Sequence, residues 1–329
     1  MSEGMSVIIC CYNSAPRLPR TLEHLALQHT PSLPWEIVLV DNRSTDDTRR
    51  TAVETWSRLG RHDVPLHVVD QPVPGLSYAR QKGVEASRYA LLLFCDDDNW
   101  LSPNYVEDAF RILHARADIG ALGGTGQAVA DVPLPSWFEA YKACFACYPQ
   151  GKQEGELSGT NAFLYGAGLV VRRDALDRLA QKQFKPILPD RVGSKLSSGG
   201  DTELSYALRL TGYKLWYSEK LMFQHHLPAS RLTEQYLYRL VSALAYCSGL
   251  LITYNYLLEG KKITSLTWIK DTLYQFTFLL RALVSYPFTK QAVMEKNLGV
   301  LFSWNKFKSI VAQAGAYGSR DRQIRKLIE

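Results

Sequence analysis

Three adjacent carboxylates, Asp96, Asp97 and Asp98, follow the most hydrophobic run of the chain, residues 89–95. Like charges at neighbouring positions repel one another, so a positive group must offset them. A divalent cation is the natural candidate, because such ions bind one or two carboxylates and keep open positions for substrate phosphates. Alternation in extended backbone would direct Asp96 and Asp98 to one side and Asp97 to the other. The alternative is a solvated acidic turn that only leads into the next helix.

Two further polar clusters follow apolar runs of the same kind. Tyr12 and Asn13 come after residues 6–11, and the stretch 41–44 (Asp-Asn-Arg-Ser) ends the run 36–41. In an open parallel sheet, ligands bind at the carboxyl ends of the strands. We therefore expect these clusters to converge with the three carboxylates at one edge of a sheet.

The first half of the chain alternates apolar runs with amphipathic stretches, which predicts crossover units and a parallel sheet. Ser44 with Asp47 has the pattern of a capping box, and Ser102 before Pro103 is typical of an N-cap. Residues 123–126, Gly-Gly-Thr-Gly, predict a tight turn. Strands are expected at 6–11, 36–41, 66–70, 89–95, 214–217 and 221–224, helices at 14–28, 44–59, 76–86, 102–115 and 201–210, and a strand running into a helix at 166–176.

The composition is that of an ordinary globular protein, with 46% hydrophobic and 21% charged residues, which excludes a disordered or fibrous chain. Six cysteines in 329 residues are too sparse for a disulfide scaffold. The opening MSEGM leads straight into an apolar run without a basic stretch, so we expect no signal peptide and a reduced, cytoplasmic location.

Positive charge is concentrated in the last third of the chain. Residues 1–227 hold 24 Lys and Arg against 26 Asp and Glu, a net of −2, and residues 228–329 hold 14 against 6, a net of +8; together they give the +6 of the whole chain. These basic residues are scattered among apolar helices rather than forming one stripe, so nucleic-acid binding is not expected.

Residues 240–258 contain no charged residue, and as a helix they would extend about 28 Å, close to the roughly 30 Å core of a bilayer. Three interpretations stay open: a buried core helix, an interfacial helix, and a membrane span. We expect a helical subdomain that packs on the rest of the chain and touches the cytoplasmic face of a membrane. A plain core helix with a homodimer interface stays open beside it.

Five segments stand out along the chain, in the order SVIICCYN, EIVLVDNRSTDDT, GLSYARQKGV, LLLFCDDDNWLSPNYV and GGDTELSYALRLTGYKLWYSEKLMFQH. Such segments occur in the same order in family 2 glycosyltransferases of the GT-A fold, which the chain resembles over residues 6–227. Each segment alone is a weak match. The five in order are specific for the family, but they do not indicate which sugar is transferred.

The resemblance implies an α/β fold, the GT-A nucleotide-diphospho-sugar transferase fold. This fold has a Rossmann-like mixed sheet, mainly parallel and flanked by helices, and here it would carry a C-terminal helical subdomain. Residues 1–230 would form the catalytic domain, with 1–118 as the nucleotide-sugar-binding half and 119–230 as the acceptor and catalytic half. Residues 231–329 would form the helical, basic and apolar subdomain, in contact with a membrane surface.

The resemblance also assigns roles to individual residues. Asp98 and His225 would hold a divalent cation, Mn²⁺ or Mg²⁺, and the adjacent His226 is the alternative to His225. Asp201 matches the aspartate of the family's Glu-Asp pair and would be the catalytic base, although Gly200 precedes it in place of glutamate. At a helix start, Asp201 would also suit an N-cap. The implied donor-binding residues are Cys11, Tyr12, Asn13 and Asp41 for the base, Arg80 for the base or phosphates, Asp96 for the ribose, and Asp97.

The implied activity is inverting transfer of a sugar from a nucleotide-diphosphate sugar, UDP-linked by preference, to a glycan or lipid-linked acceptor in surface polysaccharide assembly. A metal-dependent nucleotidyltransferase would share the metal carboxylates but gives no reason for Asp201 and His225. A non-catalytic sugar-nucleotide-binding or scaffold protein on the same fold is the alternative from another class.

Overall fold

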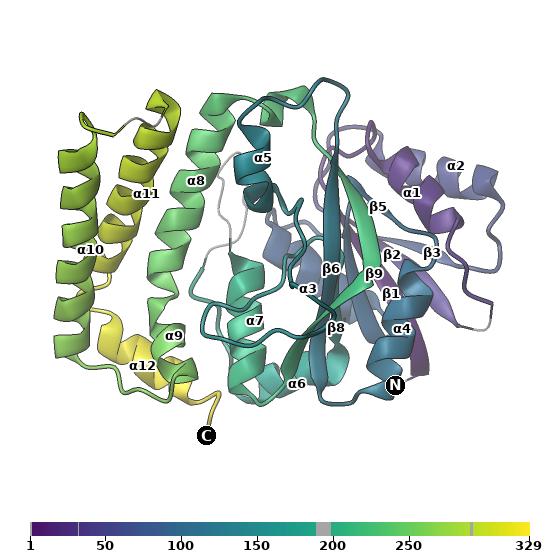
Figure 1. The fold of residues 1–329 in the computed structure, drawn as a ribbon. Helices are drawn as coiled ribbons and strands as arrows, with labels where there is room; N and C mark the ends of the chain where they lie inside the picture. Colours follow the sequence, from purple (N-terminus) through teal and green to yellow (C-terminus); the bar gives the residue numbers. More distant parts are fainter. Residues whose placement is uncertain (1, 32, 189–198, 290–291) are drawn as a thin grey trace.

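A mixed sheet forms the centre of the protein in the computed structural model, which describes residues 2–31, 33–188, 199–289 and 292–329 (Figure 1). Within these residues the sheet has nine strands in the order β3-β2-β1-β4-β8-β6-β9-β5, with β7 paired to β9. The strands are β1 (Ser2–Cys11), β2 (Trp35–Asp41), β3 (Leu66–Asp70), β4 (Tyr89–Asp96), β5 (Asn99–Leu101), β6 (Ile119–Val129), β7 (Gly155–Glu156), β8 (Leu169–Arg172) and β9 (Lys214–His226).

Strands β1 to β4 are mutually parallel, β8 is antiparallel to β4 and β6, and β6 and β9 are parallel again. The central strand β1 is buried on both faces, so that Ile8 and Ile9 point into two different hydrophobic clusters. This explains why its sequence is a continuous apolar run rather than an alternating one. The expected mixed, mainly parallel sheet flanked by helices is confirmed.

The helices differ from the expected ones mainly at their starts. They are α1 (Leu18–Ala26), α2 (Thr48–Leu59), α3 (Leu76–Ala86), α4 (Tyr105–Ala115), α5 (Phe138–Tyr141), α6 (Arg173–Gln181), α7 (Gly200–Leu210), α8 (Glu234–Leu250), α9 (Ile252–Leu258), α10 (Ser265–Ser285), α11 (Val293–Val311) and α12 (Tyr317–Arg325). The predicted capping box at Ser44 is wrong, because the Ser44 hydroxyl accepts the backbone N–H of Asn13 at 3.0 Å and α2 begins only at Thr48. The predicted N-cap at Ser102 is also wrong, since Asn104 occupies that position.

The predicted tight turn at 123–126 is a stretch of strand β6. A Cβ on Gly124 would lie 1.7 Å from the Leu221 carbonyl oxygen, and one on Gly126 would lie 1.9 Å from the Ala146 carbonyl oxygen. These glycines therefore allow close approach of neighbouring backbone instead of a turn. The two short strands expected at 214–217 and 221–224 are one strand, β9, whose register against β6 shifts between Gly123 and Thr125.

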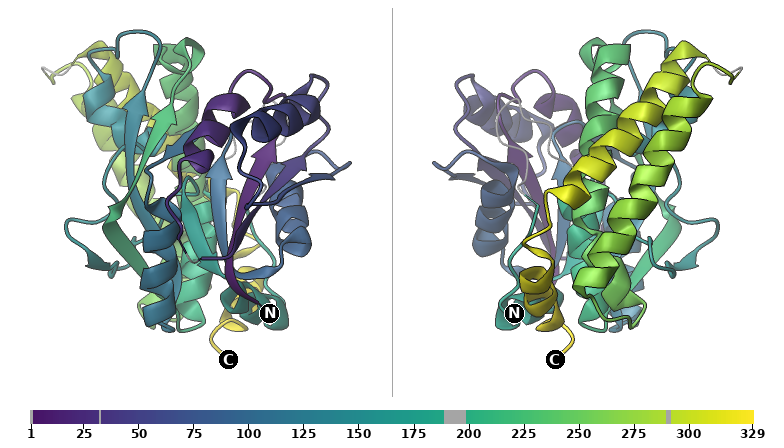
Figure 2. Two further views of the ribbon diagram at one scale, coloured as in Figure 1. Left: turned by 90° about the vertical axis from the view of Figure 1, so that its right-hand side faces the viewer. Right: turned by 90° about the vertical axis from the view of Figure 1, so that its left-hand side faces the viewer.

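The C-terminal helices form a layer beside the sheet, in which α11 packs on α8 and α10 packs on α11 (Figures 1 and 2). The uncharged stretch 240–258 falls on α8 and α9, and much of it is core: Leu240, Ala245, Tyr254 and Leu257 are buried. Across the described ranges, no single helix has the length and hydropathy of a membrane span. Helices α8 and α9 taken together do have them, but they are bent by 47° relative to each other.

Candidate active site

One cavity of about 920 Å³ opens where the polar clusters at the strand ends meet. It receives side chains that follow β1 and β4, from α3 and α7, and from the end of β9. The expected convergence at one sheet edge is therefore confirmed, and the functions of the individual residues stay predictions. Eight of the ten predicted site residues line the cavity: Cys11, Tyr12, Arg80, Asp96, Asp97, Asp98, Asp201 and His225.

The other two predicted residues, Asn13 and Asp41, hold the loop between β2 and α2 rather than line the cavity. The Asn13 Oδ1 accepts the backbone N–H of Thr45 at 2.8 Å, and the Asp41 Oδ1 accepts that of Ser44 at 2.9 Å. Arg43 and Thr45, from the same loop, are the residues that reach the cavity. In this structure Asn13 and Asp41 position the cavity wall.

Asn42, which had no predicted role of its own, holds the loop between β3 and α3 in place. Its side chain is buried, donates to the carbonyl oxygens of Gln71 at 3.0 Å and Val73 at 2.6 Å, and accepts the Gly75 N–H at 2.8 Å. These bonds hold the loop in which Pro74 and Gly75 line the cavity. The only signal in the sequence was its place in the polar cluster after β2.

All three adjacent aspartates face the cavity, so the predicted separation of Asp97 from its neighbours is wrong. The alternation fails because the backbone turns at Asp97 and Asp98 between β4 and β5. The Asp97 carboxylate pairs with the Arg17 guanidinium at 2.5 Å, and Asn99 donates to Asp98 at 3.2 Å. Arg17 thus offsets part of the repulsion that the sequence predicted.

The Asp98 carboxylate is buried and lies between two cationic side chains. Its Oδ1 is 3.5 Å from His225 Nε2, and its Oδ2 accepts from the Arg231 guanidinium at 3.1 Å. Burial favours the neutral form of Asp98, but His225 and Arg231 outweigh it and hold the pKa of this carboxyl well below its usual range. Burial likewise opposes charge on His225, and Asp98 reverses this and raises the pKa of His225 to about 10.

His225 and its neighbour His226 have different surroundings. His225 Nδ1 donates to the Phe145 carbonyl oxygen at 2.8 Å, which fixes the ring and directs Nε2 toward Asp98. His226 Nε2 lies 3.0 Å from Asp131 Oδ2, and the His226 ring stacks on that of Trp100 with 5.4 Å between the ring centroids. His226 does not line the cavity. Of the two histidines, only His225 lines the cavity and faces Asp98, and its role as a cation ligand stays a prediction.

The side chains present fit a divalent cation. Among residues 2–31, 33–188, 199–289 and 292–329, no group of three or more His, Cys, Asp or Glu side chains is arranged around a metal position. Asp98 and His225 nevertheless offer one carboxylate and one imidazole, whose Nε2 proton a cation would displace on binding. The Nδ1–H bond of His225 to a carbonyl is the usual outer-shell support for a ligating histidine. Two protein ligands leave open positions for diphosphate oxygens, as Mg²⁺ and Mn²⁺ sites commonly do.

Asp201 lies in the first turn of α7, where Gly199 is the N-cap, so the predicted N-cap role of Asp201 is wrong. Its Oδ2 accepts the Gly166 N–H at 2.7 Å and its Oδ1 accepts the Thr202 N–H at 2.9 Å. Two backbone amides thus hold the carboxylate at the cavity wall, and its function as a general base stays a prediction.

Helix α8 and the segment before it complete the cavity. Arg231 contributes its guanidinium, and Tyr236, Leu240 and Leu244 contribute a largely apolar wall. Sequence reasoning missed Arg231, because its partner Asp98 lies 133 positions away and no local pattern marks the pair. The predicted division at residue 230 stays a prediction, but the cavity takes side chains from both sides of it.

Comparison with solved structures supports the same fold. Residues 1–349 of TarS from S. aureus, in complex with UDP, match with a TM-score of 0.52 and 17% identity over 97% of this chain and 91% of TarS 1–349. The mannosyltransferase PcManGT from Pyrobaculum calidifontis, in complex with GDP-Man and Mn²⁺, matches with a TM-score of 0.55 and 14% identity over 100% of this chain and 86% of the other. At these identities the likeness establishes the GT-A fold and not the substrate.

Sequence comparison identifies the family. The protein EpsH from Bacillus subtilis is 30% identical over 116 residues, which are 35% of this chain and 32% of EpsH, so the match spans about a third of that relative. The profile described as "Glycosyl transferase family 2" matches residues 6–180, more than half of the chain. The protein therefore belongs to glycosyl transferase family 2.

Proposed function

We propose that the protein is an inverting, cation-dependent glycosyltransferase that moves a sugar from a UDP-linked donor to a glycan or lipid-linked acceptor. One observation carries the proposal: Asp98, His225 and Asp201, from three distant parts of the chain, line a single cavity at the carboxyl ends of the strands. The UDP complex of TarS supports a nucleotide-sugar donor, and the GDP-Man complex of PcManGT makes GDP-linked sugars the first alternative.

Asp98 and His225 would hold the cation, which supplies charge neutralisation for the departing diphosphate. Arg231 adds a guanidinium beside the same carboxylate, and its planar donors match phosphate oxygens. Because this group is held in place before the reaction, it stabilises the leaving group without reorganising.

Asp201 would act on the acceptor. An acceptor hydroxyl attacks the anomeric carbon while the bond from that carbon to the diphosphate oxygen breaks, and the hydroxyl proton passes to Asp201. A carboxylate in this position contributes on the order of 10²–10⁴-fold in rate. A single displacement of this kind inverts the anomeric centre.

We also propose a cytoplasmic location at the membrane face, where lipid-linked glycans are assembled. The support is the net charge of +8 in residues 228–329 and the aromatic content of these helices. A role in surface polysaccharide assembly would follow from such an acceptor.

A thermal-shift screen of nucleotide sugars with and without Mn²⁺ tests donor and cation together. We expect stabilisation by one UDP-sugar that depends on the cation, and release of UDP when the acceptor is added. Asp201→Asn should keep this donor response and lose turnover, whereas the exposed Asp70→Asn should change neither. Full transfer by Asp201→Asn would refute the base assignment, and release of pyrophosphate would indicate a nucleotidyltransferase.

A further inference from the structure

Helix α10 buries two polar side chains beside Leu279 and exposes most of its apolar ones, unlike a surface helix of a soluble protein. Its inward side includes Asp271 and Gln275, each 7% exposed, and the Asp271 carboxylate accepts from the hydroxyls of Tyr256 at 2.5 Å and Tyr317 at 3.1 Å. A helix in contact with water normally buries apolar residues and exposes polar ones. The outward side of α10 therefore needs a partner other than water.

The outward side carries a continuous apolar stripe. Its members recur at spacings of three and four residues, which places them on one face along the whole helix. Exposed fractions reach 66% at Leu266 and 59% at Leu273. The stripe consists of Leu266, Ile269, Leu273, Phe276, Leu280, Leu283 and Val284.

The apolar surface continues beyond the stripe onto the neighbouring helix. Phe302 and Trp304 on α11 are exposed, as are Tyr274 and Phe278 on the other flank of α10. Figure 2 shows α10 and α11 side by side on the outer side of the molecule. We call the exposed apolar residues of α10 and α11 the hairpin face. The hairpin face is wider than the narrow apolar stripe along which one helix packs against a single partner helix.

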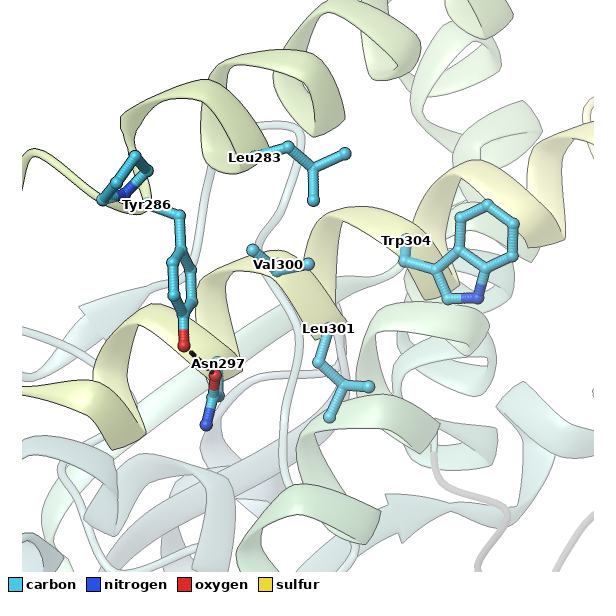
Figure 3. A pocket seen from close by; sticks show the side chains of 7 residues that line it. Leu283, Tyr286, Asn297, Val300, Leu301 and Trp304 are labelled. Atoms are coloured by element: carbon cyan, nitrogen blue, oxygen red, sulfur yellow. Dashed lines mark hydrogen bonds between the residues drawn. The ribbon is translucent and has the colours of Figure 1, made fainter.

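A recess lies at one end of the hairpin face. This cavity of about 430 Å³ is lined by Leu283, Val300, Leu301 and Trp304, with Tyr286 bonded to Asn297 at its edge (Figure 3). The recess gives apolar chains a place to enter between the ends of the two helices.

The charges around the hairpin face select the partner. Residues 259–311 hold eight Lys and Arg against three Asp and Glu, a net of +5; of the three acids, Glu259 pairs with Lys261 and Asp271 is buried. A twofold contact with a second copy would set this face against itself and bring cations together. An anionic lipid surface offers both the apolar interior and the complementary charge.

We propose that the hairpin face is a membrane-docking surface, which inserts its apolar residues among the acyl chains of an anionic lipid layer while Lys270 and Arg281 contact the headgroups. Helix α8 packs on α11 and lines the catalytic cavity, so docking would hold that cavity near the membrane. This inference rests on the proposed function at a membrane face, and it identifies the surface that would bind the membrane.

Flotation of the full chain with vesicles tests the proposal, and it needs neither donor nor acceptor, so its failure would leave the transfer chemistry intact. Vesicles of phosphatidylcholine are compared with vesicles that also contain phosphatidylglycerol, at low and high salt. We expect binding to the anionic vesicles that weakens with salt. Lys270→Glu with Arg281→Glu should weaken it by at least about fivefold for each cation removed.

The apolar contribution is tested by Leu273→Glu with Leu280→Glu, which should weaken binding by on the order of 100-fold. Val53→Glu is the matched control, because Val53 is 51% exposed on α2, at a distance along the chain from the hairpin face. Circular dichroism checks whether the double variant is folded. If it is not, the dependence of binding on lipid and salt in the unaltered protein tests the proposal. Absent binding, binding indifferent to anionic lipid, or a dimer that Leu273→Glu dissociates would each overturn the proposal.

Discussion

Arg231 donates a hydrogen bond to Asp98 Oδ2 at 3.1 Å, although the two residues lie 133 positions apart in the chain. Arg231 belongs to the short segment between β9 and α8, and Asp98 to the turn after β4. The segment that leads into the C-terminal helices thus contributes a charge to the cavity. Its position beside the proposed cation ligand makes Arg231 the first residue to test.

Replacing Arg231 with alanine removes one preorganised donor from the place where the diphosphate would gain charge. We expect kcat/KM to fall by about 10²–10³-fold. Arg231→Lys should recover part of the loss, because lysine keeps the charge but not the planar fork. Steady-state kinetics with the donor found in the screen measures this, and Arg322→Ala on α12 is the control. An unchanged kcat/KM in Arg231→Ala would remove Arg231 from the mechanism.

The two neighbouring histidines provide an internal comparison for the cation site. His225→Ala should abolish the Mn²⁺-dependent thermal shift seen with nucleotide, because it removes the imidazole beside Asp98. His226→Ala should retain that shift, since His226 contacts Asp131 and Trp100 instead. Equal losses in both variants would contradict the assignment of His225.

The pair of Asp98 and His225 predicts a pH window for stability in cation-free buffer. The lowered pKa of Asp98 stabilises the fold above its ordinary value of 3.8, and this contribution is lost as the pH falls below that. The raised pKa of His225 stabilises the fold below its ordinary value of 6.5, and this contribution fades as the pH rises toward about 10. The contribution is therefore complete between about pH 4 and 6.5.

Asp98→Asn should accordingly cost about 3–5 kcal/mol within that window, because it leaves a buried cation without its partner. The difference in melting temperature from the unaltered protein, measured with chelator, should shrink as the pH is raised toward 10. A difference that grows between pH 7 and 10 would show that the pair is not charged as described.

The convergence at the strand ends was predictable because it depends on topology alone. Once 6–11, 36–41 and 89–95 are parallel strands, the residues after them must share an edge. The direction of Asp97 was not predictable, since it depends on a turn rather than on continued extended backbone. Arg231 was missed for a different reason: its partner Asp98 is remote in sequence, and no local pattern marks such a pair.

The glycine-rich stretch shows the same limit within the fold. Glycine is a turn signal when only local chemistry is considered, and the prediction for 123–126 followed that signal. In the structure these glycines serve contacts of β6 with Leu221 and Ala146, which a local pattern does not contain. The exposed stripe of α10 is a parallel case, because only the packing of α10 on α11 shows which side of the helix faces outward.

Gly124 offers a test of this interpretation of β6. A methyl group at this position would lie 1.7 Å from the Leu221 carbonyl oxygen, which is backbone and cannot rotate away. Gly124→Ala should therefore destabilise the protein by several kcal/mol or prevent folding, as overpacking at a rigid site does. Gly299→Ala on α11 is the matched control, because a Cβ there meets nothing within 4 Å and alanine favours helix by about 0.8–1 kcal/mol. Chemical denaturation measures the free energy of unfolding of both variants. A Gly124→Ala protein as stable as its parent would contradict the close contact with Leu221 and favour the predicted turn.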